Sequence, residues 1–508
     1  MDAETILRIK PALTGYLHEF DDCFGRSQTR GHLATYVRGQ LGDLPRKSVE
    51  PMADAAGAPP RTLQEFLSLS RWDEPRMRDR LQRRVARRHG HAQSVGIIDE
   101  TSFVKKGDKT ACVQRQHCGA AGKTENCVVS VHLGYATPGP RGFHTLLDGE
   151  LYLPEKTWDG DPDRRREAGV PDELAYRSKW RMALAQYRRA VGNGVRFGWL
   201  TFDEGYGGKP PFLRELDAVG QDYVAEVPRD FRVWTRAPQV LHRRHARDMN
   251  KVGRPRKLPR LKAKHNPAVP VEHVLRYSPA MRKQPWVKHH VRDGTRGPMV
   301  WQVKHLPVYL PDEHGLPAGG GKPYHLLAAR NVFKPDEVKY LISNANESTP
   351  VETLLLVALS RWKIERMFED SKMELGMDHF EVRKYQSISR HLILSCVSHL
   401  FLAEFHQAHA GDASGGGGGG ASGGGGKKSG ADDQPDRHGR EPTGPALGAW
   451  RPLLASHRRT DQRAIGDNAT TQRQSRPQPP QANPPQIARD RHPVEGPTQV
   501  SMDDEVAL

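Results

Sequence analysis

The sequence predicts an α/β fold, in which a mixed sheet is flanked by helices and carries an N-terminal helical domain and a β-rich insertion. Apolar residues recur with helical spacing up to about residue 90, and Pro and Gly stand at the breaks. From residue 95 the apolar period changes to two, and strands then alternate with helical stretches. A segment rich in Arg, Lys, His and Pro, residues 229–320, interrupts this pattern and indicates an insertion.

Residues 1–90 are expected to form short helices with many arginines on their surfaces. One interpretation is a small helical bundle with a solvated basic face. The other is a domain that binds DNA ends, since clustered arginines are typical of nucleic-acid-binding helices. Arg46 and Lys47 precede a short helix and are the candidates for contacts with DNA phosphates.

Residues 91–228 are expected to form the first part of the core. "SVGIIDE", "ACVQRQH" and "NCVVSVHLGYA" are predicted strands, and a helix is predicted near 172–191. The strand "RFGWLTFDEGYG", the helix "FLRELDAVG" and the strand "DYVAEVP" follow. The order β-β-β-α-β-α-β, with acids where strands end, is typical of an RNase H-like core.

The insertion at 229–320 is expected to hold short strands and loops, and its centre contains "VGRPRKLPR". Gly253-Arg254-Pro255 has the form of an AT-hook, so Arg254, Arg256 and Lys257 are candidates for a narrow A·T minor groove. A solvated basic loop that touches phosphates is the alternative.

Residues 321–409 are predicted to complete the core. Two strands, "YHLLAAR" and "VKYLISN", are expected to return to the sheet. A charged helix over 349–375 and an apolar helix that must be buried follow. Residues 410–508 are rich in Gly, Pro and Gln, so this tail is predicted to be disordered.

The chain of 508 residues carries 77 Lys and Arg against 60 Asp and Glu, a formal charge of +17. This excess attracts polyanions without identifying one. Five cysteines suggest no disulfide framework, so a reducing cytoplasm is expected, and their spacing does not match structural zinc. No apolar run is long enough for a signal peptide or a bilayer span, so no membrane partner is expected.

Three carboxylates are candidates for chemistry. Asp99 in "GIIDET" and Asp203 in "WLTFDEGYG" each end an apolar strand and are followed by Glu. In "SRWKIERMFEDSK", helical spacing puts Glu365 on one face with Arg361, Glu369 and Lys372. Two aspartates and a glutamate would suit Mg²⁺ or Mn²⁺. The structural alternatives are loop N-caps for the aspartates and a plain i,i+4 ion pair for Arg361 and Glu365.

Arg361-x3-Glu365-x6-Lys372 resembles the Y-x2-R-x3-E-x6-K signature of DDE transposases from bacterial insertion sequences, which belong to the RNase H-like endonucleases. "RWKIERMFEDSKMELGMDHFEVRKYQSISRHLIL" resembles the third-acid region of that group. "GIIDETSFVKKG" and "WLTFDEGYG" resemble the first-acid and second-acid regions, and the similarity runs in order over roughly residues 15–405. The signature's Tyr falls at Ala358.

The resemblance implies that Asp99, Asp203 and Glu365 are the catalytic metal ligands, and that Arg361 and Lys372 act at the DNA strand. It implies two Mg²⁺ ions, for which Mn²⁺ can substitute, and double-stranded DNA as substrate, both terminal inverted repeats and target. It further implies a homodimer in a synaptic complex, and DNA cleavage and strand transfer in the nucleoid-associated cytoplasm of a bacterium.

Two other functions stay open from the sequence. One is an inactive or domesticated DNA-binding derivative that acts as a repressor. The other is an RNase H-like nuclease that cuts branched DNA, such as a junction resolvase.

Overall fold

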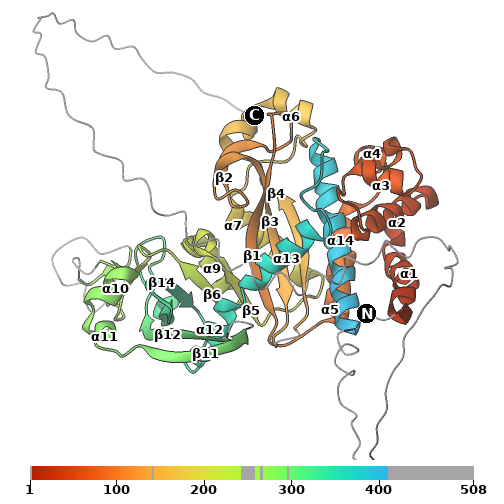
Figure 1. The fold of residues 1–508 in the computed structure, drawn as a ribbon. Coiled ribbons are helices and arrows are strands. Elements are labelled where there is room, and N and C mark those ends of the chain that lie inside the picture. Colours follow the sequence, from red (N-terminus) through yellow and green to blue (C-terminus); the bar gives the residue numbers. More distant parts are fainter. Residues whose placement is uncertain (1–2, 140–141, 242–257, 264–266, 295–296, 410–508) are drawn as a thin grey trace, which may run out of the picture. The chain divides into compact units, whose positions relative to one another are not determined.

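The first ninety residues fold as helices, as their apolar spacing predicts. The computed structural model describes residues 3–139, 142–241, 258–263, 267–294 and 297–409 (Figure 1). Arg254, Arg256 and Lys257 and the predicted tail lie outside the described residues. The N-terminal helices are α1 (Ala3–His18), α2 (Ser27–Leu41), α3 (Val49–Ala55), α4 (Pro60–Ser68) and α5 (Glu74–Arg88).

Two arginines of α5 join the helical region to the rest of the chain. Arg84 is buried and pairs with Glu19 and with Glu404, whose Oε2 lies 2.5 Å from Nη2. Arg78 is buried too, and its Nε lies 2.8 Å from an oxygen of Asp148. These two side chains therefore hold the fold together, whereas the sequence left open either a solvated basic face or a DNA-binding surface for such arginines.

One mixed sheet of ten strands runs through the described residues in the order β11-β12-β13-β14-β6-β5-β1-β3-β2, with β4 paired to β3. β1 lies parallel to β5 and β5 parallel to β6, while the other neighbours are antiparallel. The predicted α/β class with a mixed sheet is thus confirmed. The strands are β1 (Val95–Val104), β2 (Gln114–Cys118), β3 (Lys123–Ala136), β4 (His144–Leu151), β5 (Trp199–Phe202), β6 (Tyr223–Val227), β11 (Val287–Gly294), β12 (Gly297–Val308), β13 (Tyr324–Asn331) and β14 (Lys334–Ser343).

The insertion extends this sheet. Its long strands β11 and β12 pair with each other, β12 continues to β13, and β14 adds to the edge of β6. Two small sheets and two short helices complete the described part of the insertion: β7 (Arg232–Val233) with β10 (Val269–Pro270), β8 (Val240–Leu241) with β9 (Arg260–Leu261), α10 (Val271–Tyr277) and α11 (Pro279–Arg282).

The sequence reading missed β4 and misplaced one helix start. β4 pairs with β3 from His144 to Leu151, in a stretch for which no strand was predicted. The helix expected from 172 begins only at Lys179, as α7 (Lys179–Gly192). The other α-helices between β4 and β6 are α6 (Pro162–Ala168), α8 (Glu204–Gly207) and α9 (Pro210–Ala218).

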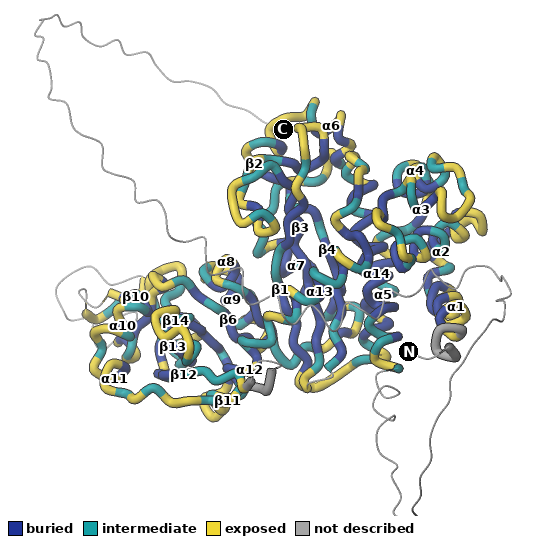
Figure 2. The backbone as a smooth tube through the Cα atoms, in the orientation of Figure 1, coloured by how far each residue is buried: buried dark blue, intermediate teal, exposed yellow. Residues whose placement is uncertain are grey.

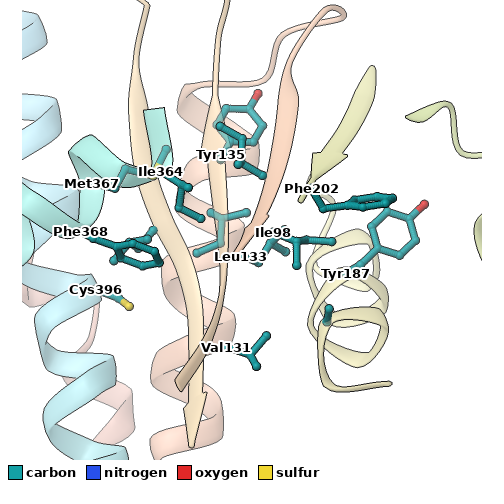
Figure 3. Close-up of a cluster of buried hydrophobic side chains, with 14 of the residues drawn as sticks. Ile98, Val131, Leu133, Tyr135, Tyr187, Phe202, Ile364, Met367, Phe368 and Cys396 are labelled. Atoms are coloured by element: carbon teal, nitrogen blue, oxygen red, sulfur yellow. The ribbon is translucent and has the colours of Figure 1, made fainter. Parts of the chain in front are cut away.

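Helices cover both faces of the central strands. Figure 3 shows Ile364 and Met367 reaching one face, while Phe202 and Tyr187 lie on the other side. Gly134 of β3 permits this close approach, because a Cβ there would lie 2.8 Å from the Met367 sulfur. The strands in the middle of the sheet are consequently buried (Figure 2).

The charged helix predicted over 349–375 is broken into α12 (Val351–Leu359) and α13 (Trp362–Met373). The Ser360 hydroxyl donates to the Val357 carbonyl at 2.6 Å, and the Arg361 N–H bonds to the Ala358 carbonyl, three residues back. Such local bonds compete with a continuous helix. The break places Arg361 at the start of α13.

The predicted apolar helix is α14 (Tyr385–His409), and most of its residues are buried, as expected. It contacts β4 and helices of the N-terminal region. Among the described residues, no helix is both long enough and apolar enough to span a membrane.

His391 of α14 is buried between three segments. Its Nδ1 accepts from the Tyr36 hydroxyl at 2.7 Å, and its Nε2 donates to the Met377 carbonyl at 3.0 Å. Burial lowers the pKa of His391 from 6.5 to about 4. The unfolded chain therefore takes up this proton first, and stability is lost as the pH falls from about 6.5 through 4.

We expect His391→Gln to reduce this acid sensitivity, because the amide can keep both hydrogen bonds without a proton to gain. A full shift from 6.5 to 4 corresponds to about 3 kcal/mol. Urea unfolding at pH 7 and pH 4.5 measures the effect. His314→Gln, at an exposed site, is the control and should leave the loss on acidification unchanged. Equal losses in His391→Gln and the wild type would contradict the assignment.

Candidate active site

The parallel pairing of β1 and β5 brings two acids together. Ile98 lies opposite Phe202 at the end of this pairing, and Asp99 and Asp203 are the next residues on the two strands. The sequence placed Asp99 at the end of its strand, but β1 continues to Val104, so this detail is corrected. It is the parallel partner, β5, that ends here, at Phe202. Ligands of α/β sheets bind at such carboxyl ends.

Glu365 is connected to Asp99 through the side chain of Arg361. It lies in the first turn of α13, with its side chain 61% exposed. The Arg361 guanidinium bridges Asp99 and Glu365: Nη1 lies 2.9 Å from Asp99 Oδ2, and Nη2 lies 3.1 Å from Glu365 Oε1. The first and third candidate acids are thus linked by one side chain.

Burial sets the electrostatics of the two aspartates. It raises the pKa of Asp99 to about 7, against the opposing effect of Arg361, and the nearby charge of Asp203 adds to the rise. The pKa of Asp203 is raised by burial in the same way. Desolvated carboxylates that repel each other favour a proton or a cation close by. The pair is therefore poised to bind positive charge.

Local hydrogen bonds hold both aspartates. Asp203 caps α8, and its Oδ1 accepts from the Gly205 N–H at 3.0 Å. Asp99 Oδ1 accepts from the N–H of Glu100 at 2.8 Å. Asp203 therefore does act as a helix N-cap, which was the structural alternative for this residue. Capping uses one oxygen of the carboxylate.

The neighbouring acids have other partners or are exposed. Glu100 pairs with Lys179 of α7, with 2.7 Å between Oε1 and Nζ, although its charge also helps raise the pKa of Asp203. Glu204 is exposed at the start of α8. Glu369, the rival to Glu365, pairs with Arg366 at 3.3 Å.

Glu226 of β6 was missed by the sequence reasoning. It pairs with Lys339 of β14, with 2.6 Å between Oε1 and Nζ, and its charge helps raise the pKa of Arg361. Glu226, Lys339 and Arg361 line a cavity of about 90 Å³, together with Ala358 of α12. The sequence did contain a signal for this residue, because Glu226 is the single charged residue within the strand "YVAEV".

Two of the proposed DNA contacts, Lys372 and Arg46, lie near the end of α13 and the segment that follows it. The Lys372 ammonium lies 3.4 Å from the Ser102 carbonyl and over the Phe103 ring, and burial lowers its pKa. Arg46 is exposed and pairs with Glu381 at 2.5 Å.

Lys47 is not placed to bind DNA, which corrects the expectation. It is 7% exposed, and its ammonium donates to the carbonyls of Gln40, at 2.8 Å, and Glu374. Burial lowers its pKa to about 8. The side chain ties α2 to the end of α13 instead.

The donor set suits a divalent cation, because the candidate acids offer only hard carboxylate oxygens. Arg361 lowers the pKa of both desolvated aspartates and also pairs with Glu365, so its one positive charge is shared among three acids. In the described part of the chain, however, no three His, Cys, Asp or Glu side chains are already gathered to share one ion. The guanidinium of Arg361 stands between two of the acids.

Comparison with known proteins identifies a family. Residues 19–298 match the model of the DDE superfamily endonuclease family, a stretch that contains Asp99 and Asp203 but ends before Glu365. The chain is 26% identical over 354 residues to a probable transposase for insertion sequence element IS701 from Microchaete diplosiphon. That alignment covers 69% of this chain and 76% of the relative.

Proposed function

This chain belongs to the DDE superfamily of endonucleases, and on that premise we propose that it is a transposase of an insertion sequence of the IS701 type. Membership of the family implies nuclease chemistry with a divalent metal ion. The proposed reaction is hydrolysis of DNA at the element's terminal inverted repeats, followed by transfer of the exposed 3′-hydroxyl end to target DNA.

The observation that carries the proposal is the meeting of Asp99 and Asp203 beyond paired parallel strands, with Glu365 joined to Asp99 through Arg361. We propose that these three acids hold two Mg²⁺ ions, or Mn²⁺ in their place. Such ions would activate the attacking oxygen and stabilise the leaving oxygen in phosphodiester cleavage.

The protein's own residues supply the positioning. Strand pairing fixes Asp99, and capping of α8 fixes Asp203, so both carboxylates are held before substrate arrives. Arg361 and Lys372 would receive DNA phosphates next to the acids, and exposed Arg46 would contribute further along the duplex. Arg254, Arg256 and Lys257 stay candidates for a DNA arm, outside the described residues. A homodimer that pairs two DNA ends, acting in the cytoplasm, completes the proposal.

A cleavage assay on the element's own ends tests this function. The purified full chain is incubated with duplexes that carry the DNA flanking its gene, or with scrambled duplexes, in Mg²⁺, Mn²⁺ or EDTA. We expect strand-specific nicks at the repeat only with a divalent ion, and joining of the new 3′ end to a target plasmid. Denaturing gels map both products.

Two outcomes would favour the alternatives. Tight binding to the repeats without cleavage, even in Mn²⁺, would identify a DNA-binding repressor, for which the replacement of the signature's Tyr by Ala358 is the specific observation. Cleavage of branched DNA without any requirement for a repeat would identify a junction-resolving nuclease.

A further inference from the structure

Arg361 is held by the same oxygens that the proposed function assigns to the metal ions. Its two terminal nitrogens each contact a different acid, Asp99 at 2.9 Å and Glu365 at 3.1 Å. The guanidinium is largely removed from solvent, with 22% of the side chain exposed. Charge-assisted bonds of this kind are among the stronger hydrogen bonds in proteins.

We propose that Arg361 is a built-in counter-cation, which occupies the space between Asp99 and Glu365 in the metal-free protein and must be displaced when a divalent ion binds there. The inference rests on the proposed function, because it takes these acids as the metal ligands. It assigns Arg361 a positioning role in metal loading in addition to its role at the DNA strand.

Competition follows from charge and geometry. A divalent ion and a guanidinium on the same carboxylates repel each other strongly in a partly desolvated site. Both oxygens of Asp99 are already engaged, because Oδ1 accepts the Glu100 N–H and Oδ2 is bonded to Arg361. An ion that binds between Asp99 Oδ2 and Glu365 Oε1 would therefore occupy the place of the guanidinium.

The structure also provides a place for the displaced side chain. A cavity of about 90 Å³ lies beside Arg361 and is also lined by Ala358. Glu226 lines this cavity too; it pairs with Lys339, and its charge already acts on Arg361, so it offers the guanidinium a further acidic partner. A side chain with two positions requires such an alternative partner.

Binding of Mn²⁺ to the full chain without DNA tests the inference, with electron paramagnetic resonance as the readout. We expect Arg361→Ala to bind Mn²⁺ about tenfold more tightly than the wild type, or better, since the competing cation is gone. Adding guanidinium ion at millimolar concentration should weaken Mn²⁺ binding by Arg361→Ala and leave Mn²⁺ binding by the wild type unchanged. Only the variant has an unoccupied site for the added ion.

Arg276→Ala is the matched control. It breaks an i,i+4 Arg–Glu pair on α10, with Glu272, and should bind Mn²⁺ like the wild type. Wild-type affinity in Arg361→Ala, or no competition from guanidinium ion in that variant, would overturn the counter-cation proposal while leaving the metal site intact. Mn²⁺ binding that survives Asp99→Asn in both backgrounds would instead remove the metal site, and the proposed function with it.

Discussion

Asp203→Asn is expected to lower the rate of Mg²⁺-dependent nicking about a thousandfold, the loss that follows when a metal ligand stops carrying charge. The fold should persist, because the Asn carbonyl can still accept the Gly205 N–H that Asp203 now accepts at α8. Stability without metal should stay the same or rise, since a desolvated carboxylate disappears. Single-turnover nicking and thermal unfolding measure the two effects.

The same assay separates the candidate acids from their neighbours. Asp99→Asn and Glu365→Gln should also abolish nicking, and Asp99→Asn additionally releases Arg361. Glu204→Gln is the matched control, since Glu204 follows Asp203 directly but is exposed at the start of α8. If Glu204→Gln lost activity and Asp203→Asn kept it, the assignment of the second acid would be wrong.

Asp99 and Asp203 could be found from sequence because local pattern and chemistry agree there. An apolar run that stops at an acid is visible in any window, and parallel strands bring such ends together. Glu365 was visible through helical spacing. Its link to Asp99 was not, because the bridge by Arg361 depends on how α13 crosses the sheet.

Burial of polar side chains explains why the role of Lys47 and the strand β4 could not be predicted from the sequence. The local sequence around Lys47 is typical of a surface cation. In the fold, its ammonium donates to the carbonyl of Glu374, a residue far along the chain. β4 looks too polar for a buried strand, because Asp148 and Glu150 interrupt its apolar residues. The partners of Asp148 come from α5 and α7, and the partner of Glu150 is Arg177, just before α7, so no local pattern predicts them.

Asp148 is accordingly the residue whose loss should destabilise the fold most. It is fully buried, and its two oxygens lie 2.8 Å from Arg78 Nε and 2.6 Å from Arg189 Nη1. Asp148→Asn keeps the shape but removes an anion from Arg189 and from the buried Arg78, which keeps its pair with Glu74 at 3.1 Å. We expect a loss of about 3 to 5 kcal/mol in unfolding free energy, measured by urea denaturation. Asp163→Asn, at an exposed ion pair with Arg166, should change it by less than about 0.5 kcal/mol.

The double variant Asp148→Asn with Arg78→Met decides whether the ion pair itself is the cause. When both charges are removed, no buried cation is left without a partner, so the double variant should recover a large part of the stability lost by Asp148→Asn alone. Losses that simply add would mean that Asp148 acts mainly through its other contacts, with Arg189, Gln82 and the Gly149 N–H. Recovery would identify β4 as a strand that depends on Arg78 of α5, which is why its own residues did not predict it.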